Sequence, residues 1–213
     1  MTMNRRDFLR MSAALTAAGM SPSLFAATKE QFTIYGAPAM PSVTIAVAAA
    51  QGKLAKQADV ALEIWRSPDQ LRAGVASGQF KVMMSPSNVG VNLRNQGQQV
   101  GMVNILTNGI TQLMCKSTPI TSPQELVGKK ILVPFKNDMP DIVLQALLKK
   151  LNIDINKVDI TYAATPTEAI GLFLLKDFHA AILPEPMASA VVQKAKIVGT
   201  EIVRGFDLVK EWG

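Results

Sequence analysis

Residues 130–162 read KILVPFKNDMPDIVLQALLKKLNIDINKVDITY, and this stretch decides the fold. Lys130–Pro134 is a short apolar run that predicts a buried strand, and Val158–Tyr162 predicts a second strand. Between them, Pro140–Leu151 carries apolar residues three and four positions apart, which predicts an amphipathic helix. A strand, a helix and a further strand in this order are typical of a parallel sheet covered by helices. We therefore predict an α/β protein.

The same alternation extends to both sides of this stretch. Further strands are predicted at Gln31–Tyr35, Val60–Trp65, Lys81–Met84, Val100–Leu106, Gln112–Cys115, Ala180–Leu183 and Ile197–Val203. Further helices are predicted at Val43–Gly52, Gln70–Ser77, Ser87–Asn95, Ser122–Leu126, Pro166–Leu175 and Pro186–Lys194, the first of them buried. The pattern is interrupted at Thr107–Gly109, which we interpret as a hinge. We therefore expect two α/β lobes, 28–108 and 109–203, with 204–213 beginning a return to the first lobe.

Composition excludes several classes of function. The chain has 213 residues, and 48% hydrophobic against 18% charged residues is incompatible with a disordered protein. The chain has 22 basic and 16 acidic residues, and the first 27 positions hold three of the basic residues and one of the acidic residues. The rest of the chain therefore carries 19 basic and 15 acidic residues, a net charge of +4. This charge is too weak to indicate a nucleic-acid-binding surface. One cysteine, Cys115, and one histidine, His179, exclude an internal disulfide and leave little material for a metal cluster. We therefore expect no cofactor and no metal.

The first 27 residues are interpreted as an export signal. Arg5 and Arg6 are followed by Asp-Phe-Leu-Arg, then by a mildly apolar stretch of small residues, and Ala26 and Ala27 suit a signal peptidase. Paired arginines in this context resemble the twin-arginine signal. The apolar stretch of about ten residues is well short of the roughly 20 that a transmembrane helix needs. Periplasmic export is expected, while cleavage and retention as an anchor both stay open.

Loops at the predicted strand ends supply the candidate ligand site. In open parallel sheets the ligand binds beyond the carboxyl ends of the strands, where helix N-termini offer free N–H groups. The loops here are rich in small hydrogen-bonding residues and proline, and they present no set of catalytic residues. The candidate ligand-binding residues are Pro38, Met40, Ser42, Ser85, Ser87, Asn88, Asn108, Phe135, Asn137, Asp138 and Glu185.

Four stretches carry a resemblance to a known family. They are Gly36–Ser42, Ser122–Ile131, Thr165–Ala169 and Pro184–Ala188, each at the start of a predicted helix or strand. Their order and spacing resemble the periplasmic substrate-binding proteins of ABC importers, in the branch that binds sulfonates, taurine, nitrate and thiamine precursors. The resemblance implies a two-lobed fold of type II and a turn at Glu185 that faces the cleft. Because members usually run to about 300 residues, it also implies a chain truncated at its C-terminus, with an incomplete first lobe.

The resemblance predicts the function and leaves two rivals. It implies a monomer that captures a small organic anion or heteroaromatic molecule and delivers it to an ABC permease. A sensing subunit for a membrane kinase or chemoreceptor would have the same fold and pocket. An enzyme is disfavoured, because the sequence contains neither a Gly-x-Ser-x-Gly elbow nor a Gly-x-x-x-x-Gly-Lys phosphate loop.

Overall fold

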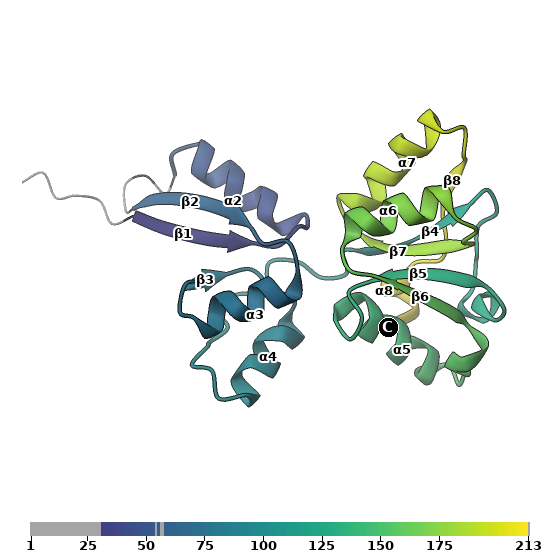
Figure 1. Cartoon of the computed structure of the whole chain (residues 1–213), viewed down its shortest axis with the longest axis horizontal. Helices are drawn as coiled ribbons and strands as arrows, with labels where there is room; N and C mark the ends of the chain where they lie inside the picture. Colours follow the sequence, from purple (N-terminus) through teal and green to yellow (C-terminus); the bar gives the residue numbers. More distant parts are fainter. Residues whose placement is uncertain (1–30, 54, 56–57, 213) are drawn as a thin grey trace, which may run out of the picture.

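The computed structural model describes residues 31–53, 55 and 58–212, and this part of the chain contains two sheets. The first sheet has strand order β2-β1-β3, and the second has β6-β5-β7-β4-β8. Each sheet has its own helices, so the described chain forms two lobes joined by one extended connection (Figure 1). The predicted signal, residues 1–27, lies outside the described residues. No helix within the described ranges is long and apolar enough to cross a membrane.

The first lobe is a small parallel sheet with helices on both faces (Figure 1). Its core includes Trp65, whose indole Nε1 donates a hydrogen bond of 2.8 Å to the carbonyl of Met84, and the stacked rings of Tyr35 and Phe80. Ser67 accepts from the backbone N–H of Gln70, a side-chain cap of the kind that starts a helix. The elements are β1 (Gln31–Gly36), α2 (Pro41–Ala50), β2 (Asp59–Ile64), α3 (Pro68–Ala76), β3 (Val82–Met83) and α4 (Ser87–Asn95).

One helix of this lobe differs from its prediction. The helix expected at Val43–Gly52 is α2, but Ser42 is its one buried residue. Val43 and Val47 are exposed by 47% and 46%. The apolar sequence led us to expect burial, yet α2 packs chiefly against β2, and the outer side of the helix has no cover from the described residues.

The second lobe holds most of the core, in two clusters on opposite faces of its sheet. In β7, Ala180 and Ile182 face one cluster while Ala181 and Leu183 face the other, as the two-residue period of a strand requires. Helix α5 covers the first face, and α6 and α7 cover the second. The elements are β4 (Thr111–Lys116), η2 (Pro123–Leu126), β5 (Lys130–Pro134), α5 (Met139–Lys150), η3 (Ile155–Lys157), β6 (Asp159–Ala163), α6 (Pro166–Leu175), β7 (Ala180–Pro184), α7 (Met187–Ile197), β8 (Ile202–Arg204) and α8 (Leu208–Trp212).

The second sheet is mixed rather than parallel throughout. Strands β5, β6 and β7 are parallel, whereas β4 runs antiparallel to both β7 and β8. The reason is that β4 enters from the connection between the lobes, without a crossover helix before it, so the alternation does not determine its direction. The strand predicted at Ile197–Val203 is shortened to β8, because α7 continues through Ile197.

Two further segments differ from their predictions. Residues 100–106 form no strand, and they run through the extended connection between α4 and β4. At the C-terminal end, Phe206 and Leu208 are buried in the core of the second lobe, and α8 packs against β4. Residues 204–212, predicted to begin a return to the first lobe, therefore lie against the second.

Candidate functional site

The lobes meet at Asp138, the buried residue that caps helix α5. Its Oδ1 accepts from the backbone N–H of Met139 at 2.8 Å, so the carboxylate satisfies the start of its own helix. The same Oδ1 accepts from Nδ2 of Asn88 in the first lobe at 3.2 Å. Its Oδ2 accepts from Nη2 of Arg72, also in the first lobe, at 3.4 Å. One carboxylate of the second lobe thus binds two helices of the first.

These contacts are partly open to solvent on the side of the first lobe. The Arg72 side chain is 41% exposed, whereas the Asp138 side chain is 3% exposed. Arg72 also divides its guanidinium between Asp138 and Asp69, which lies at 3.2 Å on the same helix. Asn88 brings a second feature: its Oδ1 is buried and has no hydrogen-bond partner among the described residues. The contact therefore includes one buried acceptor atom whose hydrogen-bonding capacity no described residue uses.

Phe135 adds an apolar contact between the lobes. It follows β5 and packs against the buried cluster of the first lobe, which includes Trp65 and Leu71. Phe135 and Asn137 both adopt a φ of 61°, a left-handed conformation that costs an ordinary residue about 1 kcal/mol or more. This turn holds Phe135 toward the first lobe while Asp138 starts the next helix.

A network behind the turn holds its strained backbone. Asp141 is fully buried, and its Oδ2 accepts from the backbone N–H of Asn137 at 2.8 Å. Its Oδ1 accepts from the Tyr162 hydroxyl at 2.9 Å and from Gln145 Nε2 at 2.8 Å. Lys136 Nζ lies 5.2 Å from the centre of the Tyr162 ring, within the range of a cation–π contact. Strand β6 and helix α5 thus fix the turn that reaches the first lobe.

The second contact between the lobes involves Glu185, after β7. Its carbonyl accepts from the backbone N–H of Met40 in the first lobe at 2.8 Å. Its carboxylate is already engaged within the second lobe, with Arg204 Nη2 at 2.9 Å and with the backbone N–H of Ser189. The main chain of Glu185, and not its charge, therefore reaches across to the first lobe.

The structure brings five of the eleven predicted residues to the lobe contact: Met40, Asn88, Phe135, Asp138 and Glu185. The other six make none of the contacts between the lobes just described, although the backbone N–H of Asn137 donates to Asp141 within the second lobe. Ser42 is buried inside the first lobe, where its hydroxyl donates to the carbonyl of Ala37 at 2.6 Å. Pro38 and Ser85 are half-buried, while Ser87, Asn108 and Asn137 are exposed.

Sequence reasoning missed four residues of this region: Arg72, Asp141, Tyr162 and Arg204. Arg72 lies one helical turn after Asp69, which is typical of a solvated helix face, and no local pattern signals its partner 66 residues away. Asp141 follows Pro140 in a first helical turn, where an acidic residue is expected for the helix dipole alone. Their roles depend on tertiary contacts.

Tyr162 makes the network sensitive to alkaline pH. Burial, reinforced by Asp141, raises the pKa of Tyr162 to about 12, against about 10 in an unfolded chain. The resulting stability is fully present below pH 10 and is lost as pH rises from 10 to 12. We expect Tyr162→Phe to remove this loss, so the free energy of unfolding, measured by urea denaturation, declines less steeply over that range. Tyr35→Phe is the matched control, and equal flattening by both variants would contradict the assignment.

The single histidine and the single cysteine serve the fold. His179 Nδ1 accepts from the backbone N–H of Lys130 at 3.0 Å and so ties β7 to the start of β5. Cys115 is fully buried in β4, and burial raises the pKa of its thiol, which opposes thiolate formation. Among the described residues, no group of three or more His, Cys, Asp or Glu side chains is placed to hold a metal ion.

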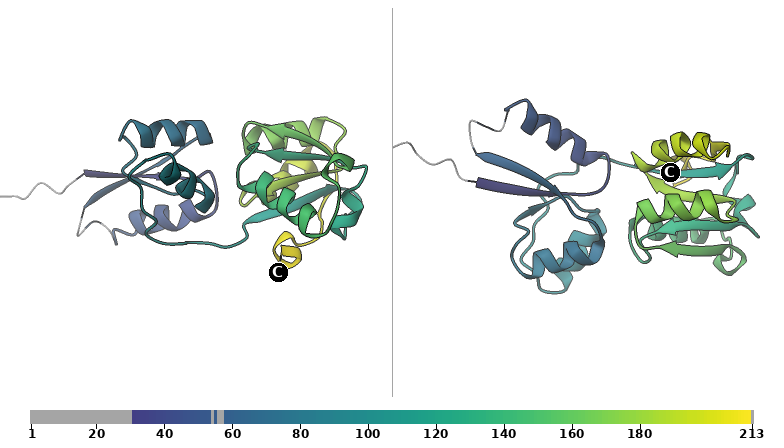
Figure 2. Two further views of the ribbon diagram at one scale, coloured as in Figure 1. Left: turned by 90° about the horizontal axis from the view of Figure 1, so that it is seen from below. Right: turned by 45° about the horizontal axis from the view of Figure 1, so that its top comes forward.

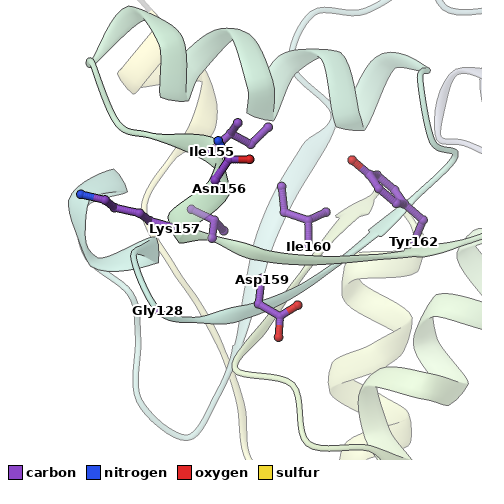
Figure 3. A pocket seen from close by; sticks show the side chains of 8 residues that line it. Gly128, Ile155, Asn156, Lys157, Asp159, Ile160 and Tyr162 are labelled. Carbon is purple, nitrogen blue, oxygen red and sulfur yellow. The ribbon is translucent and has the colours of Figure 1, made fainter.

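A shallow hollow lies at the outer edge of the second sheet, away from the lobe contact. It is bordered by Gly128, by η3 and by the edge strand β6. Figure 3 shows Ile160 and Tyr162 pointing toward α5, while Asp159 points to the other face. The Tyr162 hydroxyl ends at Asp141, so this side of the sheet supports the turn at Phe135 from behind.

The described chain thus forms two α/β lobes, in which the turns after β5 and β7 of the second lobe contact the first lobe. Residues 40–173 match the family described as NMT1/THI5 like, and the chain belongs to that family. Residues 2–22 match the twin-arginine translocation signal sequence, which confirms the predicted export signal. The comparison with curated proteins finds no match to this chain.

Solved structures share the fold. An ABC transporter protein from Parabacteroides distasonis has 20% identity and a TM-score of 0.60, with 85% of this chain and 59% of that chain covered. The alkanesulfonate-binding protein SsuA from Xanthomonas axonopodis pv. citri, bound to MOPS, has 18% identity and a TM-score of 0.61, with 84% and 62% covered. A histidine kinase sensor domain similar to periplasmic binding proteins has 14% identity and a TM-score of 0.56, with 83% and 77% covered. The chain thus spans about three fifths of the first two structures.

Proposed function

We propose that the chain is an exported solute-binding protein that captures a small organic molecule between its lobes and delivers it to an ABC importer. The single observation that carries the proposal is the contact at Asp138. A buried carboxylate of one lobe is held by two side chains of the other, through hydrogen bonds of 3.4 and 3.2 Å that a ligand between the lobes would replace. Membership of the NMT1/THI5-like family and the export signal support the same function.

The ligand-binding residues that we propose are those at the lobe contact. Phe135 offers an aromatic face for the apolar part of a ligand, and Arg72 and Asn88 offer a cation and an unpartnered acceptor for a polar head. Most of the binding free energy would come from burying the apolar part, while the polar groups set its orientation. Residues 107–109 would act as the hinge when the lobes close around it.

A ligand should stabilise the protein and draw the lobes together. In a thermal-shift screen of small sulfonates, carboxylates and aminopyrimidines, a ligand at 100 times its Kd should add about 2.7 kcal/mol to stability. Phe135→Ala should weaken binding of that ligand about tenfold or more. The matched Phe178→Ala, at a residue partly buried against the core of the second lobe, should leave the affinity unchanged. Small-angle scattering should show compaction with the ligand bound. If only metal ions or long peptides raised the melting temperature, the proposal would be wrong.

A sensing subunit is the second candidate, favoured by the resemblance to a histidine kinase sensor domain. Binding would look the same in both cases, so the partner decides. Ligand-dependent association with a permease favours import, and association with a kinase favours sensing. We infer further that the protein is not an enzyme, which predicts that the bound molecule is recovered chemically unchanged after prolonged incubation.

A further inference from the structure

Each polar group of Glu185 has a hydrogen-bond partner, and the partners lie on separate parts of the chain. Its backbone N–H donates to the carbonyl of Ile110 at 2.9 Å, and its carbonyl accepts from the backbone N–H of Met40 at 2.8 Å. Its Oε1 accepts from Arg204 Nη2 at 2.9 Å, and its Oε2 accepts from the backbone N–H of Ser189 at 3.1 Å. Ile110 stands at the end of the connection between the lobes, which both views of Figure 2 show. Glu185 therefore joins this connection, β8, α7 and the first lobe.

The carbonyl of Glu185 serves the start of a helix in the other lobe. Met40 is the N-cap residue of α2, and its side chain makes no capping hydrogen bond. Backbone N–H groups at the start of a helix have no acceptor within that helix, and Glu185 supplies one to Met40 from the second lobe. A hydrogen bond weakens steeply when donor, hydrogen and acceptor depart from a line. The strength of this contact therefore depends on how firmly the residue that carries the carbonyl is held.

Arg204 holds the side chain of that residue. It is the last residue of β8, and its Nη1 donates to Oε1 of Gln112 on β4 while its Nη2 donates to Oε1 of Glu185, both at 2.9 Å. Gln112 pairs with Leu183 in the ladder between β4 and β7, so the guanidinium is fixed to the two strands from which the turn emerges. The planar guanidinium presents several donors in a rigid fork and so binds both acceptors at once, as a lysine ammonium does not.

We propose that Arg204 is a positioning residue for the contact between the lobes. It fixes the carboxylate of Glu185, so that the carbonyl of the same residue stays directed at the start of α2. The hydrogen bonds and strand pairing of Arg204 lie within the second lobe, and it acts on the first lobe through Glu185. The inference concerns how the lobes hold each other and needs no ligand, so it goes beyond the proposed function.

Amide hydrogen exchange, measured residue by residue by NMR on the exported chain, tests the proposal. In Arg204→Ala the Met40 N–H should exchange about fivefold or more faster than in the unaltered protein, because its acceptor is no longer held in direction. The N–H groups of Leu132 and Ile182, which are fully buried in β5 and β7, should keep their rates. Equal acceleration at all three positions would mean that Arg204 only stabilises the second sheet. That result, or an unchanged rate at Met40, overturns the proposal.

Three further variants separate positioning from a general effect of charge. Arg204→Lys keeps the charge but loses the fork, so the Met40 rate should fall between those of the unaltered protein and the alanine variant. Lys130→Ala is the matched control, because it removes another exposed ion pair of the second lobe, with Asp177 at 3.6 Å, and should leave the Met40 rate unchanged.

The third variant, Glu185→Gln, removes the ion pair and leaves both main-chain groups of the residue in place. It should accelerate exchange at Met40 by itself. Adding Arg204→Ala to it should then cause little further acceleration, because both substitutions break the same interaction. If the two accelerations multiply in the double variant, Arg204 does not act through Glu185, and the proposal is wrong.

Discussion

Replacing Arg5 and Arg6 together by lysine should abolish export of this protein. A translocase receptor reads the paired arginines, and the planar guanidinium fork offers donor geometry that a lysine ammonium does not reproduce. The net charge of the signal stays the same, so a loss would reflect geometry and not charge. The measurement uses residues 1–30 fused to a reporter that is active only when exported in folded form, and periplasmic activity should fall to background.

Two controls test whether export depends on the paired arginines and on the twin-arginine translocase. Arg10→Lys changes the one other arginine of the signal and should leave export largely intact, because Arg10 is outside the pair. A strain without the twin-arginine translocase should show no export of the unaltered fusion. Full export of the double lysine variant, or export in that strain, would exclude this pathway.

The two lobes differ in how their stability is supplied. Both faces of the second sheet are covered, and its strand β7 is buried along its whole length. Among the described residues the first sheet has three strands, and its helix α2 exposes much of its apolar surface. Because hydrophobic stabilisation scales with the apolar area removed from water, the first lobe should open at lower free energy than the second.

Most of the fold could be predicted because its signals are local. The predicted and observed bounds of α4 and α6 are identical. A proline precedes the first residue of α4 and a threonine cap precedes that of α6, and a polar residue follows the last residue of each helix. The exceptions depend on distant neighbours. A strand at Val100–Leu106 needs a partner that the described chain does not place beside it, and the direction of β4 depends on the connection that precedes it.

The candidate site could be predicted in part for a similar reason. Asn88, Phe135 and Asp138 were found because loops at strand ends meet where two lobes face each other. Arg72 and Arg204 were missed because each is an ordinary helix or strand residue by its local sequence, and only the folded chain brings their carboxylate partners near. The turn at Glu185 contacts the first lobe through its main chain, because Arg204 already occupies its carboxylate.

Asp141→Ala is expected to lower the free energy of unfolding by about 3 kcal/mol. The substitution removes the acceptor of three hydrogen bonds at once, from the Asn137 backbone, from Gln145 and from the Tyr162 hydroxyl. Leaving a buried donor without a partner costs about 1–3 kcal/mol, more than the net gain from making one hydrogen bond. Urea denaturation of the exported chain measures the change.

The same substitution should also weaken the contact between the lobes, because the turn loses the bond that offsets its strain. With Asn137 no longer held by Asp141, the left-handed backbone at Phe135 and Asn137 can relax, and Phe135 then leaves the core of the first lobe. Asp141→Asn is the matched control, since it keeps one carbonyl acceptor and should cost roughly half as much. Fluorescence of Trp65, which lies in the cluster that Phe135 contacts, reports the turn separately from global unfolding when Trp212, the other tryptophan, is replaced by Phe in all variants. An Asp141→Ala variant of unchanged stability, or one in which Trp65 emission stays native, would show that the network does not hold the turn.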